Sequence, residues 1–178
     1  MSAGEQEAVA VRAATPADVG LLMTMIGELA EYERLADQVR ATEQLLDRAL
    51  FGEVPSAEAL IAERPGPPAQ PIGYALYFRT FSTFLAIQGI WLEDLYVRPE
   101  HRKGGAGKAL LAAVAARLRE GGGERLEWAA LDWNELALGF YRGLGAQAMN
   151  EWVTHRLVGE DLARLAAEAP PVDGAARR

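Results

Sequence analysis

Residues 93–111, EDLYVRPEHRKGGAGKALL, contain the side chains of this chain that are best suited to bind phosphate. A strand-like segment leads into a glycine-rich turn, and the turn opens a helical pattern near Lys108. The exposed N–H groups and the positive dipole end of such a helix bind phosphate oxygens, and glycine lets the backbone approach them closely. Arg102 and Lys103 add positive charge beside Lys108. We expect residues 102–108 to hold phosphates; the alternative is a turn that only links strand to helix.

Spacing separates this turn from two common phosphate loops. A Walker-type loop needs glycine five residues before Gly107 and Ser or Thr after Lys108, where this chain has Arg102 and Ala109. A dinucleotide fingerprint that starts at Gly105 needs glycine at position 110, where this chain has leucine. Both patterns therefore fail.

Two neighbouring carboxylates, Glu93 and Asp94, interrupt the apolar run IWLEDLYV. In a regular strand they point to opposite faces of the sheet. If both faces are covered, at least one carboxylate is poorly solvated, and its pKa rises. Such a group accepts a proton from an ammonium, directly or through water. The alternative is an ordinary acid that is ion-paired or faces a loop.

Asn134 and Tyr141 are two helical turns apart in a short helical pattern, so they lie on one helix face. Asn134 follows a strand pattern and is suited to cap the helix. Tyr141 carries a phenol with an ordinary pKa of about 10, which can donate a proton. The alternative is a core tyrosine packed beside Phe140.

Strands alternate with helices along the chain, which predicts a single mixed α/β domain over residues 9–168, between a flexible leader (1–8) and a flexible tail (169–178). The expected strands are 8–15, 57–63, 72–78, 87–97, 125–132 and 151–158. The expected helices are 18–32, one that follows Thr42, 108–120 and 134–145. A proline-rich loop is expected at 64–71.

Composition narrows the function classes. The 178 residues include no cysteine, which excludes thiolate nucleophiles, and two distant histidines that fit no common zinc spacing, so no metal is expected. The formal net charge of −7 disfavours nucleic acid and steers cationic substrates, although surplus carboxylates also simply keep a protein soluble. Without a signal peptide or a membrane-spanning run, we expect a cytoplasmic protein with no membrane partner.

The turn at 102–107 fits the pattern Arg/Gln-x-x-Gly-x-Gly/Ala and resembles the pyrophosphate loop of the Gcn5-related N-acetyltransferase superfamily. Further segments make the chain similar to the diamine acetyltransferases, the spermidine/spermine N1-acetyltransferase group, over nearly its whole length, roughly residues 9–160. They are residues 28–39, 42–55, 74–81, 91–97 and 132–146. One departure is Lys103, where that group usually has glycine.

The resemblance implies the acetyltransferase fold, a mixed, mostly antiparallel, splayed sheet flanked by helices, with acetyl-CoA as co-substrate. It implies that Glu93 lines the substrate site and that Tyr141 protonates the departing thiolate, and we expect Glu93 to be the catalytic base. Tyr32 and Glu33 are expected to contact the amine, since an aromatic face and an anion both suit a cation. The expected cofactor-binding residues are Leu95, Tyr96, Val97, Arg102, Lys103, Gly104, Gly105, Ala106, Gly107, Lys108 and Asn134.

For function, the resemblance implies transfer of acetyl to a primary amine of a small cationic substrate, such as a diamine or polyamine, by direct attack. One alternative acceptor is a lysine-like amino acid or a protein amine. Another alternative is a non-catalytic acyl-CoA-binding regulator. The resemblance also implies a homodimer.

Overall fold

A computed structural model of the chain describes residues 9–171. Five strands form one sheet in the order β1-β2-β3-β4-β5, antiparallel except for the parallel pair β4–β5. The strands are β1 (Ala10–Ala13), β2 (Glu58–Arg64), β3 (Gln70–Ser82), β4 (Ile87–Val97) and β5 (Arg125–Trp128). The helices are α1 (Val19–Glu33), α2 (Glu43–Phe51), α3 (Ala106–Glu120), α4 (Glu135–Gly143) and α5 (Gly159–Ala167). Short 3-10 turns are η1 (Pro16–Asp18), η2 (Ala36–Gln38) and η3 (Pro99–His101). The predicted mixed, mostly antiparallel sheet flanked by helices is confirmed.

The chain divides into two compact units at Ala129/Ala130. The first contains the sheet with α1, α2 and α3, and the second contains α4 and α5. The expected boundaries at 9–168 stay a prediction; the expected leader (1–8) and residues 172–178 of the expected tail lie outside the described residues. No helix within residues 9–171 is long and apolar enough to cross a membrane.

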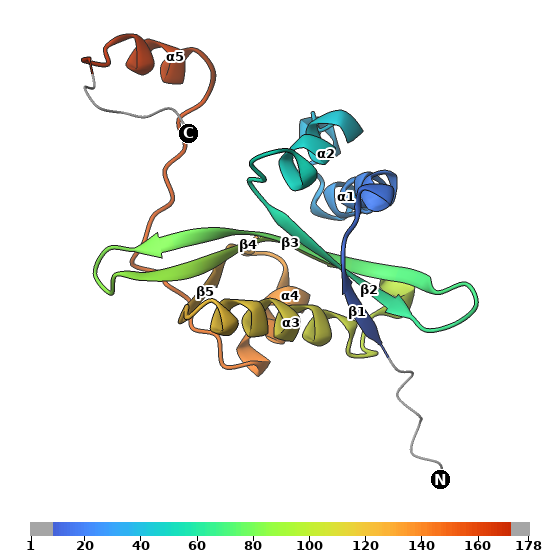
Figure 1. The fold of residues 1–178 in the computed structure, drawn as a ribbon. Helices are drawn as coiled ribbons and strands as arrows, with labels where there is room; N and C mark the ends of the chain where they lie inside the picture. The colour runs from blue at the N-terminus through green and yellow to red at the C-terminus, as the bar shows by residue number, and fades with distance from the viewer. Residues whose placement is uncertain (1–8, 172–178) are drawn as a thin grey trace. The chain divides into compact units, whose positions relative to one another are not determined.

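In the first unit, α1 and α2 cover one face of the sheet and α3 covers the other (Figure 1). The two helices bury their apolar sides against β2, β3 and β4 in a cluster that includes Leu22, Met25, Leu46, Leu50, Ile61, Tyr74 and Tyr96. On α3 the predicted stripe Leu110, Val114 and Leu118 is buried. Helical spacing of apolar residues on both helices thus produces a three-layered unit with the sheet in the middle.

β4 changes its pairing where the acidic residues begin. On β3, Leu76 pairs with Asp94, whereas Tyr77 pairs with Leu92, so Glu93 is the extra residue of a β-bulge. β5 pairs with β4 only from Gly89 to Leu92. Beyond this point, where β5 has ended at Trp128, residues 93–97 of β4 pair with β3 alone.

The C-terminal part differs from the sequence prediction. Residues 151–158 form no strand, and Trp152 and Val153 are more than 70% exposed, at 72% and 73%. A strand needs a hydrogen-bonded partner, and this segment has none among residues 9–171. The expected strand 125–132 ends at Trp128, and β3 extends back into the expected proline-rich loop.

Helix α5 is absent from the elements that the sequence patterns predict. Its signals were present: Gly159 precedes two acidic residues in the first turn, and Leu162 and Leu165 follow at helical spacing. Both leucines are exposed in the described structure. The segment is therefore a helix whose apolar side has no core of its own.

Candidate active site

The predicted phosphate loop adopts the shape that phosphate binding requires. After η3 the chain turns at Arg102 and enters α3 at Ala106, with Gly105 as the N-cap at φ 90°. The first helical hydrogen bond runs from Ala109 N to Gly105 O, so the N–H groups of residues 106–108 have no carbonyl within the helix. A Cβ on Gly105 would meet no atom within 4 Å. The helix start is thus open, and these residues fit a pyrophosphate group.

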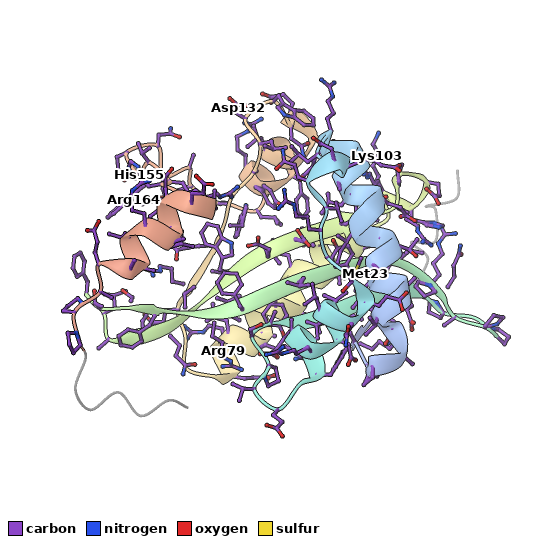
Figure 2. The ribbon with its side chains drawn as sticks, turned by 90° about the horizontal axis from the view of Figure 1, so that it is seen from above. Met23, Arg79, Lys103, Asp132, His155 and Arg164 are labelled. Carbon is purple, nitrogen blue, oxygen red and sulfur yellow. The ribbon has the colours of Figure 1, made fainter. Side chains whose placement is uncertain are left out.

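The backbone conformation of Lys103 explains why glycine suits this position. Its φ is 67°, in the left-handed region that glycine adopts without cost. For a residue with a Cβ this conformation costs roughly 1–2 kcal/mol. The departure from the family pattern therefore leaves the turn intact but strained, with the Lys103 side chain on the turn that precedes α3 (Figure 2).

The Arg102 side chain contacts the end of β4 and two aromatic rings. Its Nε donates to the carbonyl of Val97 at 2.9 Å, which holds the side chain against the end of β4. Its guanidinium carbon lies 4.7 Å from the centroid of the Tyr32 ring and 6.0 Å from that of Tyr96. The Tyr32 ring, which we expect to contact a substrate cation, thus already has a cation of the protein over one of its faces.

The last turns of α1 are also tied to β4 by an ion pair. The Nη2 and Nε of Arg98 donate to the two carboxylate oxygens of Glu28 at 2.9 and 3.0 Å. Hydrogen bonding to Arg98 lowers the pKa of Glu28. No local sequence pattern indicates this pair, because its members are 70 residues apart.

At the bulge, the two neighbouring carboxylates have different surroundings. Glu93 is exposed and accepts a hydrogen bond from Trp91 Nε1 at 2.9 Å. Asp94 is partly buried and accepts one from the Tyr74 hydroxyl at 3.0 Å. Burial raises the pKa of Asp94 to about 6, and the negative charges of Glu93 and Glu33 contribute. The poorly solvated carboxylate expected in this pair is therefore Asp94.

Glu33 extends this acidic region to the end of α1. Burial raises the pKa of Glu33, and the negative charge of Glu33 contributes to the raised pKa of both Asp94 and Tyr74. Within residues 9–171, no Lys or Arg forms an ion pair with Glu33, Glu93 or Asp94. Three carboxylates without a protein cation favour an incoming ammonium.

Asn134 and Tyr141 belong to the second unit. The predicted cap is confirmed: Asn134 Oδ1 accepts from Ala137 N at 3.2 Å and starts α4. Tyr141 follows two turns later, with its ring centroid 5.3 Å from that of Phe140. A position of either residue beside bound acetyl-CoA stays a prediction.

Comparison with known proteins decides the family. Residues 26–146 match the family model described as the acetyltransferase (GNAT) family. The chain belongs to the GNAT acetyltransferases. Every residue expected to bind or react, from Tyr32 to Tyr141, lies within the matched range. The protein is therefore an acetyltransferase, and enzymes of this family use acetyl-CoA as acyl donor.

Full-length relatives agree with this GNAT assignment. A thialysine N-epsilon-acetyltransferase of Bos taurus is 40% identical over 90% of this chain and 98% of its own. An L-ornithine N5-acetyltransferase of Arabidopsis thaliana is 32% identical over 85% of both chains. Among solved structures, an integron cassette protein from the mobile metagenome of V. cholerae matches 89% of this chain and 97% of its own, with a TM-score of 0.72 at 26% identity.

Proposed function

We propose that this GNAT enzyme acetylates the side-chain amine of an amino acid that resembles lysine or ornithine. The observation that carries the proposal is the pair of relatives named above, whose names specify thialysine and ornithine and which match at least 85% of this chain. Both substrates are amino acids with an amine at the end of a short side chain. A diamine or polyamine, the acceptor that the family resemblance implies, is the second candidate, and the acidic region favours it equally.

The acidic region supports a cationic acceptor of either kind. The region consists of Glu33 at the end of α1 and of Glu93 and Asp94 at the bulge of β4. Burial desolvates Asp94. A bound ammonium would relieve the repulsion among these carboxylates. Glu93, exposed and next to Asp94, then accepts a proton from this ammonium, directly or through one water.

The remaining steps need no covalent enzyme intermediate. The deprotonated amine attacks the thioester carbonyl, and a backbone N–H near Leu95 donates to the oxygen that becomes negative. The C–S bond breaks, and Tyr141 gives its phenolic proton to the sulfur. Leu95, Tyr96 and Val97 belong to the stretch of β4 that pairs with β3 alone, which suits an extended cofactor arm. With no cysteine in the chain, no acyl-thioester enzyme can form.

We further propose that the enzyme is a cytoplasmic homodimer without nucleic-acid or membrane partners. The net charge of −7 supports the absence of nucleic acid, since a phosphate backbone is bound by basic surfaces. The dimer rests on the family resemblance.

The test is steady-state acetyl transfer to a panel of amines, with the product identified by mass spectrometry. The panel contains thialysine, lysine, ornithine, spermidine, a short diamine and a lysine peptide. We expect the highest kcat/KM for thialysine or ornithine. A preference for spermidine or the diamine moves the assignment to the second candidate, and a preference for the peptide moves it to a protein amine. No transfer to any amine, with acetyl-CoA still bound, indicates a non-catalytic acyl-CoA-binding regulator.

A further inference from the structure

Two features expected to serve different ligands contact each other in the first unit. Tyr32, in the last turn of α1, is expected to meet the amine, and Arg102 opens the turn expected to meet the pyrophosphate. The guanidinium carbon of Arg102 lies 4.7 Å from the centroid of the Tyr32 ring. This distance is within the range of an attractive cation–π interaction.

The Tyr32 ring packs against the guanidinium of Arg102, whose side chain also donates a hydrogen bond to the carbonyl of Val97. Arg102 Nε donates to Val97 O, and this bond leaves the far end of the guanidinium to be oriented by the two aromatic rings around it. Tyr32 is the nearer ring, since the Tyr96 centroid is 6.0 Å away. Removing the Tyr32 ring therefore lets Arg102 adopt other rotamers, and binding a phosphate must then order it again.

Further contacts connect this end of α1 to the segment that precedes the loop. Arg98, which directly follows β4 and precedes η3, donates two hydrogen bonds to Glu28 of α1. A Tyr32 ring carried on this helix end has a defined position relative to Arg102. An ion pair and a cation–π contact thus connect the loop segment to the end of α1.

We propose that Tyr32 is a positioning residue for the acetyl-CoA loop, and that its stacking on Arg102 couples the binding of acetyl-CoA to the binding of the amine. The proposal rests on the proposed function for the identity of the two ligands. An amine that contacts Tyr32 and Glu33 holds the ring in place, and a pyrophosphate that contacts Arg102 does the same from the other side. Because coupling between two binding sites is reciprocal, each ligand raises the affinity for the other.

The experiment measures acetyl-CoA affinity by calorimetry, without any amine, for the wild type, Tyr32→Leu and Tyr32→Phe. We expect Tyr32→Leu to weaken acetyl-CoA binding by roughly three- to tenfold, the size of a partly exposed cation–π contact. Tyr32→Phe keeps the ring and should stay within roughly twofold of the wild type. Glu31→Gln is the matched control, because it alters the exposed residue of α1 that precedes Tyr32 and has no role assigned in either binding site; its acetyl-CoA affinity should not change.

A double-mutant cycle with Arg102→Gln separates positioning from a general disturbance of α1. In the Arg102→Gln background, Tyr32→Leu should have no further effect on acetyl-CoA affinity, because the contact is already lost. Additive losses overturn the proposal, as does an unchanged acetyl-CoA affinity in Tyr32→Leu together with a raised KM for the amine. Thermal unfolding of each variant confirms that folded protein is compared.

This outcome is independent of the identity of the acceptor. If no amine is acetylated, the proposed function fails, whereas the calorimetric comparison still decides whether Tyr32 positions the loop.

Discussion

Two aspartates of the first unit, the buried Asp18 and the partly buried Asp94, differ in whether the protein supplies a cation for their carboxylate. Asp18, at the start of α1, accepts hydrogen bonds from Arg12 Nη1 and Nη2 at 2.7 and 2.8 Å, and from the backbone and hydroxyl of Thr15. Hydrogen bonding to Arg12 lowers the pKa of Asp18 to about 2. Asp94, at the β4 bulge, accepts a hydrogen bond from the Tyr74 hydroxyl, and burial raises its pKa to about 6.

The difference separates the part of the unit that stabilises the fold from the part that we assign to function. At Asp18 the protein supplies its own cation, and the ion pair joins β1 to α1. At Asp94 and its acidic neighbours it supplies none within the described residues, although an ionised carboxylate without a cation costs free energy when desolvated. An arrangement that costs stability and persists is typical of a site completed by its ligand.

The largest expected effect concerns catalysis at the bulge. Glu93→Gln removes the proposed proton acceptor, and kcat/KM for the amine should fall by roughly 10³-fold, within the range for general-base catalysis. Asp18→Asn is the control at the other aspartate, and its folded fraction should keep the wild-type kcat/KM. Equal losses in the two variants would remove the functional distinction between the regions.

Next in size is the loss of the proposed proton donor. Tyr141→Phe removes one hydroxyl and keeps the ring packed beside Phe140, so acetyl-CoA affinity should stay nearly unchanged while kcat falls by roughly 10²-fold. Single-turnover kinetics with saturating acetyl-CoA measures this directly. If kcat stays within a few-fold of the wild type, Tyr141 is a packing residue and the thiolate departs unaided.

The free energy of unfolding should respond with opposite sign at the two aspartates. At pH 7, Asp18→Asn should destabilise the protein by about 2 kcal/mol because it breaks a favourable ion pair, and Asp94→Asn should stabilise it by about 2 kcal/mol because it removes a desolvated charge. Denaturant titration of both variants measures these values. Destabilisation by Asp94→Asn would show that the carboxylate has a compensating partner.

The pH dependence follows from the same two shifts. Asp18 has a folded pKa of about 2 against an ordinary value of 3.8, so its contribution is present above pH 4 and is lost as pH falls through 2. Asp94 has a folded pKa of about 6, so the folded state binds the proton more tightly and stability decreases as pH rises from 4 through 6. Melting curves of the wild type and Asp94→Asn between pH 4 and pH 7 should therefore diverge as pH rises.

A smaller effect is expected when a carboxylate is added where anions bind. Gly105→Asp places a negative charge beside the phosphates and a Cβ at a φ of 90°, and acetyl-CoA affinity should fall at least roughly tenfold. Gly122→Asp is the control, because Gly122 also has a positive φ, 74°, and open space around it, but lies beyond the other end of α3. Unchanged acetyl-CoA affinity in a folded Gly105→Asp variant would exclude the loop from the cofactor site.

Local patterns predicted the elements that depend on local chemistry. The ends of β4 at 87 and 97, the helix start after Thr42, the cap Asn134, the stripe on α3 and the open turn at 102–108 could all be predicted from the sequence. The bulge at Glu93 was not, because register depends on which residue of β3 lies opposite. The pair Arg98–Glu28 and the stack of Arg102 on Tyr32 were equally hidden, since both form only when the end of α1 meets β4.

The strand expected at 151–158 shows where local patterns mislead, because residues 151–158 form no strand. Its apolar and branched residues carry strand propensity, but propensity forms no ladder without a partner, and the segment has no partner among the described residues. The departure at Lys103 was visible in the sequence, and the structure supplies its physical meaning, a non-glycine residue with positive φ.

The central claim is that the three carboxylates at the end of α1 and at the β4 bulge favour a substrate that carries a second positive charge besides the reacting ammonium. The most direct measurement compares kcat/KM for thialysine with that for the same molecule without its α-ammonium group, at saturating acetyl-CoA. The two molecules share the reacting amine and the carboxylate, so the comparison isolates the second positive charge. The account predicts a loss of roughly tenfold or more on removing it, the size of a hydrogen bond to a charged group. Equal kcat/KM for the two amines would contradict it.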